Sequence, residues 1–206
     1  GEFLDYTATY NIGDFSSFET IVATLVLPDG IHLDNGTPFT LTLNSHGAVF
    51  TGPISSGNIV PILDYSGADP LPNTGLSTFT IDVSAALQSD VTPLYLDTVV
   101  FGGCSQRGSA PDCGTLNGGA TSFSIDFRGI TQSDFTDFPT SGSPAPIQAG
   151  DKLVATGQVD ANSYDSENDV PFVNPCTDNN MAEVEFTTGS LDKTIYAANG
   201  MLISGA

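Results

Sequence analysis

Oxygen-bearing side chains recur at nearly alternate positions in one short run of the chain. The run contains Asp160, Asn162, Asp165, Glu167 and Asp169. Carboxylate and amide oxygens are the ligands that Ca²⁺ prefers, and the ion takes about six to eight of them. The run therefore predicts a calcium site in a loop.

The run differs from an EF-hand calcium loop in two places. It has no glycine at its sixth position, and Pro171 stands where that loop carries a bidentate glutamate. A site gathered from several segments needs no such pattern, and Asp134, Asp137, Asp178 and Asn179 could contribute oxygens to it. The alternative interpretation is that these acidic loops are solvated and hold no metal.

The three cysteines indicate an oxidising compartment. Cys104 and Cys113 bracket eight residues rich in Gly, Pro and Ser, which can fold back so that a disulfide closes the loop. A metal site would need further Cys or His at ligand spacing, and none is near. Cys176 is left over, either buried or paired outside the chain.

Catalytic motifs are missing from the sequence. The two histidines, His32 and His46, stand in polar contexts, and there is no GxSxG, HExxH or phosphate-binding loop. We therefore expect a protein that is not an enzyme. Asn35-Gly36-Thr37 has the form of a glycosylation sequon, although Asn-Gly is equally a hairpin turn signal.

The charge of the chain excludes whole classes of partner. Its 206 residues include 24 Asp and Glu but only 4 Lys and Arg, a formal net charge of −20. Nucleic-acid binding requires a basic surface, so it is excluded, and an anionic membrane is disfavoured for the same reason. No apolar run approaches the length of a membrane span. Few lysines, no tryptophan and abundant Thr, Ser, Gly and Asp are typical of secreted β-proteins.

Periodicity predicts strands throughout. Phe3, Asp5, Thr7 and Thr9 alternate with apolar residues and Tyr, and no segment sustains a helical period, although 84–89 could form one turn. The predicted strands are 3–10, 18–27, 39–43, 48–50, 59–63, 79–83, 94–101, 123–127, 152–159, 182–187 and 194–196. Polar stretches near 65–75, 102–120, 131–146 and 160–180 are expected to be loops. Strands at this spacing predict an all-β sandwich.

Several segments resemble a known family of surface repeats. Residues 1–11, then 21–31 with its Pro-Asp-Gly turn, 149–156, 179–184 and 191–195 are similar in order to DUF11-type and isopeptide-forming D2-type immunoglobulin-like repeats. The order is rotated by one strand, and residues 35–120 match nothing in the family. The resemblance implies an immunoglobulin-like β-sandwich of a large bacterial or archaeal surface protein, with long loop insertions.

The resemblance also implies a crosslink. In the isopeptide-forming families, a lysine on the first strand joins an asparagine on the last with the help of a carboxylate. Lys193 stands at the lysine position and Asn180 near the asparagine position. Because Lys193 belongs to the following unit, such a bond would join neighbouring units. The alternative is that Lys193 pairs with an acid.

The rotated pattern leads to the functional hypothesis. We expect residues 1–190 to form one sandwich body that lacks a strand, and residues 191–206 to be donated to the next unit. The donating residues would be Lys193, Thr194, Ile195, Tyr196, Ala197 and Ala198. The protein would then be an extracellular structural repeat or filament subunit whose partners are identical units, in a homopolymer or a tandem repeat. The rival is a calcium-dependent adhesin or carbohydrate-binding module.

We predict that Ca²⁺ stabilises the fold. A ligand at 100 times its dissociation constant raises the free energy of unfolding by about 2.7 kcal/mol. Melting temperatures in calcium and in chelator should be compared at matched ionic strength, because screening alone also relieves repulsion in so acidic a chain. Equal melting temperatures would identify the acidic residues as solvated surface.

Overall fold

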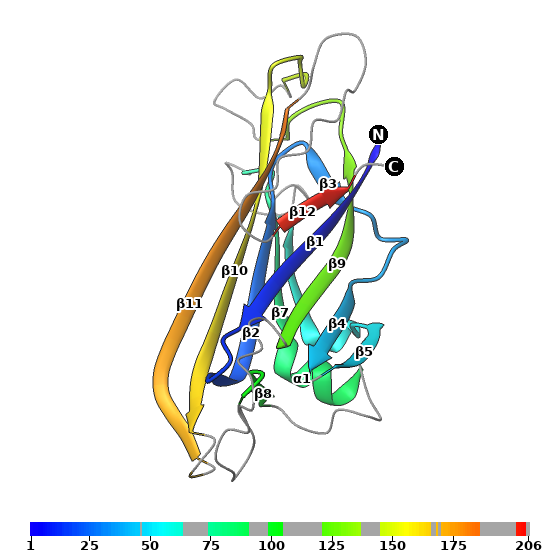
Figure 1. The fold of residues 1–206 in the computed structure, drawn as a ribbon. Coiled ribbons are helices and arrows are strands. Elements are labelled where there is room, and N and C mark those ends of the chain that lie inside the picture. The colour runs from blue at the N-terminus through cyan, green and yellow to red at the C-terminus, as the bar shows by residue number, and fades with distance from the viewer. Residues whose placement is uncertain are drawn as a thin grey trace.

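The structure, a computed structural model, describes residues 1–45, 47–63, 74–90, 99–104, 121–136, 145–165, 168, 170–185 and 201–204. These residues form two antiparallel sheets packed face to face (Figure 1). The prediction of an all-β sandwich is confirmed.

In the described part of the chain, sheet A has six strands. They run in the order β12, β1, β9, β4, β5, and β3 also pairs with β9. Their bounds are β1 (Phe3–Ile12), β3 (Ile31–Leu33), β4 (Thr40–Ser45), β5 (Ala48–Pro53), β9 (Thr121–Thr131) and β12 (Met201–Ser204). β1 pairs with β9 along its whole length, so the start of the chain is held by residues more than a hundred positions away.

Sheet B likewise has six strands among the described residues. The order is β11, β10, β2, β7, β6, and β8 pairs with the start of β2. Their bounds are β2 (Ser17–Leu27), β6 (Ile59–Leu63), β7 (Ser77–Asp82), β8 (Val100–Phe101), β10 (Lys152–Asp165) and β11 (Val170–Glu185). A short 3₁₀ helix, η1 (Ser56–Asn58), precedes β6, and helix α1 (Val83–Ser89) follows β7. Asp82 caps α1 by accepting a hydrogen bond from Ala85 N at 2.9 Å.

The core lies between the two sheets and follows directly from the period of two. Alternate residues of each strand point inward and are buried: Leu4, Tyr6, Ala8, Tyr10 and Ile12 on β1, and Ile21, Ala23, Leu25 and Leu27 on β2. An aromatic column crosses the core. The Phe127 ring stacks on the rings of Tyr6 and Phe39, with centroid distances of 5.0 and 5.4 Å. The Phe39 ring in turn contacts that of Phe79 in sheet B, with a centroid distance of 5.2 Å.

One half-buried carboxylate, that of Asp29, links the turn after β2 to the segment that follows β9. Asp29 Oδ1 accepts hydrogen bonds from Gly30 N, Thr136 N and Thr136 Oγ1 at 2.7–2.8 Å. Gly75 has a φ of +73° and packs so closely that a Cβ there would lie 2.1 Å from Asp29 Cγ. Only glycine fits this position, because both its φ and its proximity to Asp29 exclude a side chain.

Most predicted strands are confirmed, with changes at their ends. The main correction concerns 160–180, which we expected to be a loop. Residues 160–165 continue β10 and residues 170–180 belong to β11. The reason is that backbone pairing between β10 and β11 defines this hairpin, while most of its residues are of polar types that also occur in loops. The short strand β3 was not predicted. Of the strand predicted at 94–101, the structure shows only Val100–Phe101. Residues 94–98, 186–187 and 194–196, which were also predicted as strand, lie outside the described part of the chain.

We predict that Leu25→Ala lowers the free energy of unfolding by about 2–5 kcal/mol, because Leu25 is fully buried and the truncation leaves a cavity. Val26→Ala, on the half-buried outer face of the same strand, is the matched control and should cost less. Urea denaturation measures both. Equal losses would contradict the assignment of inward and outward faces.

Candidate functional site

The edge of β1 is only partly covered. β12 pairs with Asp5–Ala8 in antiparallel register, with Asp5 opposite Ser204 and Ala8 opposite Met201. Among the described residues, no strand pairs with Thr9–Ile12 on that side. The backbone groups of this stretch therefore form an open sheet edge, which is a template for another strand.

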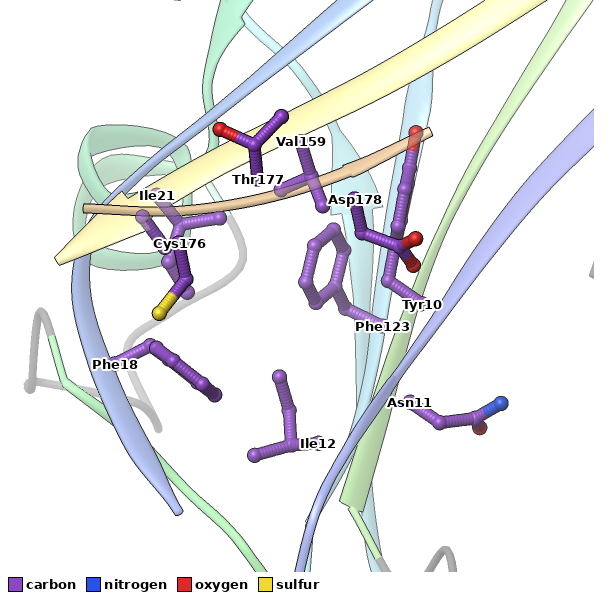
Figure 2. Close-up of a pocket in the computed structure, with 11 residues that line it drawn as sticks. Tyr10, Asn11, Ile12, Phe18, Ile21, Phe123, Val159, Cys176, Thr177 and Asp178 are labelled. Carbon is purple, nitrogen blue, oxygen red and sulfur yellow. The ribbon is translucent and has the colours of Figure 1, made fainter. Parts of the chain in front are cut away.

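An apolar slot opens beside this edge, between the two sheets (Figure 2). Its volume is about 130 Å³, close to the roughly 150 Å³ of an engineered apolar cavity that binds benzene. It can therefore hold one apolar side chain. The lining residues are Tyr10, Asn11, Ile12, Phe18, Ile21, Phe123, Val159, Ala161, Cys176, Thr177 and Asp178.

A bulge in β2 shapes one wall of the slot. Phe18 pairs with Ser163 and Val22 with Asp160, so β2 carries one extra residue between them. Thr20, within the bulge, has a φ of +48°. Residues three apart in a regular strand face opposite sides, and the extra residue allows both Phe18 and Ile21 to line the slot.

The other walls follow from regular alternation. Tyr10 and Ile12 are inward residues of β1, and the Tyr10 ring stacks on Phe123 at 4.9 Å. From sheet B, Val159 and Ala161 of β10 face the slot, with Asp178 and Cys176 of β11 directly opposite them in register. The slot thus has an apolar floor with polar groups at its β11 side.

Tyr10 supplies the most perturbed titratable group of the slot. The residue is 5% exposed, and its hydroxyl has no hydrogen-bond partner among the described residues. Burial, followed by the negative charge of Asp178, raises the pKa of Tyr10 to about 12. The hydroxyl therefore stays neutral at pH values above 10, where an exposed tyrosine would ionise.

Cys176 lies at the rim of the slot. It is exposed, carries a thiol rather than a disulfide, and its Sγ lies 3.5 Å from Ser163 Oγ. Of the two alternatives from the sequence, burial is therefore wrong. The structure leaves pairing outside the chain as a prediction.

The donor residues expected from the sequence, Lys193 to Ala198, lie outside the described part of the chain. The segment that follows them is described: Met201–Ser204, part of the 191–206 strand, pairs as β12 with β1 of its own chain. Donation to a neighbour concerns an assembly of copies and stays a prediction. The isopeptide bond between Lys193 and Asn180 also stays a prediction, because Lys193 and the side chain of Asn180 lie outside the described part of the chain. The backbone of Asn180 lies in β11, opposite Gly157.

The expected calcium ligands are partly corrected. Asp160, Asn162 and Asp165 lie in strand β10, so a loop is the wrong description for 160–165. Asp160 accepts hydrogen bonds from Thr177 at 2.5 Å and Gln158 at 2.7 Å, which lower its pKa.

The two other β10 ligands are also engaged. Asn162 donates to Thr20 at 2.7 Å, and Asp165 accepts from Asn168 at 2.6 Å. No group of three or more His, Cys, Asp or Glu that could hold a metal occurs among the described residues. Glu167, Asp169 and Asp137 lie outside that part, and calcium binding stays a prediction.

The remaining predicted positions are scattered over the fold. Cys104 is buried and Cys113 lies outside the described residues, so their disulfide stays a prediction. Asn35 is exposed in a turn where Thr37 N donates to Asp34 O at 3.1 Å, which leaves the sequon accessible. His32 lies in β3, and burial lowers its pKa; His46 is not described.

Sequence reasoning missed the slot itself. The alternation of β1 marks Tyr10 and Ile12 as inward residues, which was a usable signal. Nothing in the sequence marks the bulge at Thr20, because an extra residue in one strand is visible only against its partner strand.

Comparison with known proteins gives little. No protein-family model and no curated protein matches the chain. Among solved structures, the chain is similar to ACE19, the collagen binding subdomain of the Enterococcus faecalis surface protein ACE, at 9% identity and a TM-score of 0.39, over 90% of this chain and 88% of that one.

A second similar structure is the pilus 2b backbone protein of group B streptococcus, at 14% identity and a TM-score of 0.37, over 92% of this chain. The match spans about half of that protein, 53% of its length. Both likenesses are too remote to carry a conclusion about function. In the described part of the chain, no helix is long and apolar enough to cross a membrane.

We predict that alkaline pH destabilises the fold partly through Tyr10. In the unfolded chain this tyrosine ionises near pH 10, whereas in the folded chain it stays protonated to about pH 12. Its contribution is full below pH 10 and is lost as pH rises from 10 to 12, at no more than about 1.4 kcal/mol per pH unit. Tyr10→Phe should flatten this loss in urea denaturation measured across that range. Burial also raises the pKa of Tyr6, which remains in the variant as an internal control. If the free energy of unfolding falls with pH as steeply in Tyr10→Phe as in the wild type, Tyr10 is not the source of the alkaline loss.

Proposed function

We propose that this protein is an extracellular structural subunit that assembles head to tail, rather than an enzyme. The C-terminal segment of one copy, Lys193 to Ala198 together with the following residues, adds as a strand to the β1 edge of the next copy. Strand addition satisfies a row of backbone groups, and side chains at alternate positions fill pockets on the acceptor.

The distribution of prolines over the sheet edges carries the proposal. Proline on an edge strand blocks pairing because it lacks an N–H group. The described edge strands β5, β6 and β11 contain Pro53, Pro61, and both Pro171 and Pro175. β1 contains none. Among the outermost strands of the two sheets, the edge formed by β12 and the uncovered end of β1 is thus the one without proline. Its Thr9–Ile12 stretch lies beside the apolar slot, opposite β11.

The register of β12 supports the choice of donor. In every pair between β1 and β12 the two residue numbers add up to 209, for example in Tyr6 with Ile203. Of these residues, Tyr6 points into the core. Continued in the same register, a donor strand would set Ala197 opposite Ile12 and Ala198 opposite Asn11. Ile195 and Ala197 would then face the slot, and Thr194, Tyr196 and Ala198 would face outward.

A donated strand gains contacts beyond those of β12. β12 covers β1 only from Asp5 to Ala8. A strand running from Lys193 to Ser204 would extend the ladder to Ile12 and bury an apolar side chain against Phe18 and Phe123. Each such burial contributes about 1.5–3 kcal/mol.

We predict that deletion of residues 193–206 abolishes assembly and leaves a soluble but destabilised body. Electron microscopy and sedimentation measure the assembly. Because the truncated chain keeps its acceptor edge, it should also shorten full-length filaments when mixed with them. A synthetic peptide of residues 193–204 should do the same, and a scrambled peptide should not.

An acceptor-side variant completes the test. Ala161→Phe fills the slot from within and should block acceptance while leaving the tail intact. A truncated chain that assembles like the full chain would overturn the proposal.

A further inference from the structure

The register of β12 extends to Tyr10 with a step of only two residues. The last described pair of this ladder is Ala8 with Met201. In the same register, a strand that continues along the β1 edge would set Asn199 opposite Tyr10. Residues directly opposite one another in an antiparallel ladder point to the same face of the sheet. Because Tyr10 is an inward residue, Asn199 of such a strand would point into the sandwich.

Two polar groups line the slot where that side chain would enter. Figure 2 shows Tyr10 and Asp178 at the same end of the slot. They lie near one another, since burial and then the charge of Asp178 raise the pKa of Tyr10. The Tyr10 residue is 5% exposed, and its hydroxyl has no hydrogen-bond partner among the described residues. This hydroxyl is thus a buried O–H donor that lacks an acceptor.

Asp178 offers the complementary function, that of an acceptor. Its Oδ1 accepts from Asn179 N at 2.9 Å, and a carboxylate has about four lone-pair sites in all. The side chain is exposed in this structure. β12 contacts β11 across the sandwich, so a strand that continues β12 towards the slot would run beneath β11 and cover Asp178. A carboxylate that loses water in this way needs a donor in exchange.

We propose that Asn199 is the specificity-determining residue of the donated strand, recognised by Tyr10 and Asp178 of the acceptor. The amide carbonyl of Asn199 accepts a hydrogen bond from the Tyr10 hydroxyl, and the amide NH₂ group donates to the Asp178 carboxylate. One amide satisfies both groups, whereas an apolar side chain would satisfy neither and a carboxylate would repel Asp178. The inference rests on the proposed head-to-tail assembly and adds to it the contact that selects the donor.

The contact also fixes the register of the donated strand. A shift of one residue would turn Asn199 to the outer face of the sheet. A shift of two would set Ala197 or Met201 opposite Tyr10. Neither of these side chains carries an amide, so the hydroxyl and the carboxylate would be covered without partners, which is unfavourable.

An exchange of the amide and the carboxylate tests the contact in the full-length chain. Asn199→Asp sets two carboxylates against one another and should weaken assembly about tenfold or more. Asp178→Asn removes the acceptor of the amide NH₂ and should weaken it by a smaller factor. The double variant again pairs one amide with one carboxylate, at the net charge of the wild type, and should assemble like the wild type. Sedimentation at a series of concentrations measures the assembly of all four proteins.

The matched control is Thr194→Asp. It adds the same charge to the donated strand, at a position that the register turns outward. Adding Asp178→Asn to Thr194→Asp should not restore assembly, because the two positions do not meet. Rescue of both tail variants by Asp178→Asn would indicate a general charge effect and would overturn the inference.

Tyr10→Phe separates the contact from the stability of the fold. In the unassembled chain it removes a buried hydroxyl without a partner, so urea denaturation at neutral pH should show no loss of stability. In the assembly it leaves the Asn199 carbonyl unpaired, and we expect assembly to weaken several-fold. Equal assembly of Tyr10→Phe and the wild type would contradict the role of the hydroxyl.

The outcomes also separate this inference from the proposed function. If the wild type assembles and Asn199→Asp assembles equally well, or if Asp178→Asn does not rescue it, the contact is overturned and strand donation stands. If the full-length wild type does not assemble, the proposed function fails and this inference fails with it.

Discussion

Contact between the two sheets is the interaction on which the rest of this structure depends. Neither sheet has a second apolar layer of its own, so each inward side chain is buried only while the sheets face one another. The column of Tyr6, Phe127, Phe39 and Phe79 crosses that contact. It is strong enough to keep the Tyr6 hydroxyl buried without a partner among the described residues, although such a group costs about 1–3 kcal/mol.

A sandwich buries the apolar inner faces of its two sheets, but its edge strands still carry unpaired backbone N–H and C=O groups. The described edge strands β5, β6 and β11 are protected by proline, whereas β1 is covered only over Asp5–Ala8 by a short strand from the other end of the chain. Where that cover stops, the core beneath is not filled either, and the slot results. A further strand with an apolar side chain would pair with the open edge and fill the slot at the same time. The open edge and the unfilled core lie at the same place, and this is the basis of the assembly we propose.

The acidic charge constrains every contact the molecule can make. A net charge of −20 raises the free energy of any association that brings carboxylates together, so surfaces that meet must be neutral or must bind cations. The slot is apolar over most of its wall, and Asp178 on its β11 side is the carboxylate among its lining residues. The few basic groups that are described serve local pairs, Arg128 with Asp5 and Lys152 with Glu183, and do not change this balance.

The sequence by itself determined the fold class, most of the strands and the direction in which their side chains point. Leu4, Tyr6, Ala8 and Tyr10 are inward because side chains alternate along a strand, which is a local property readable from one segment. Composition likewise determined the net charge, and that charge is the reason we expect no binding to nucleic acid. The long hairpin at 160–180 was misread because its polar residues resemble a loop, and its strands are defined by pairing rather than by apolar alternation.

Only the tertiary structure decided which strands meet. β1 lies against β9, the bulge at Thr20 lines up Phe18 with Ile21, and the slot opens where β12 ends. Each of these depends on hydrogen bonds and packing between segments far apart in the chain. An extra residue in a strand changes which face the following side chains point to, and this change is defined only against the partner strand. Neither segment alone indicates which strand its partner is.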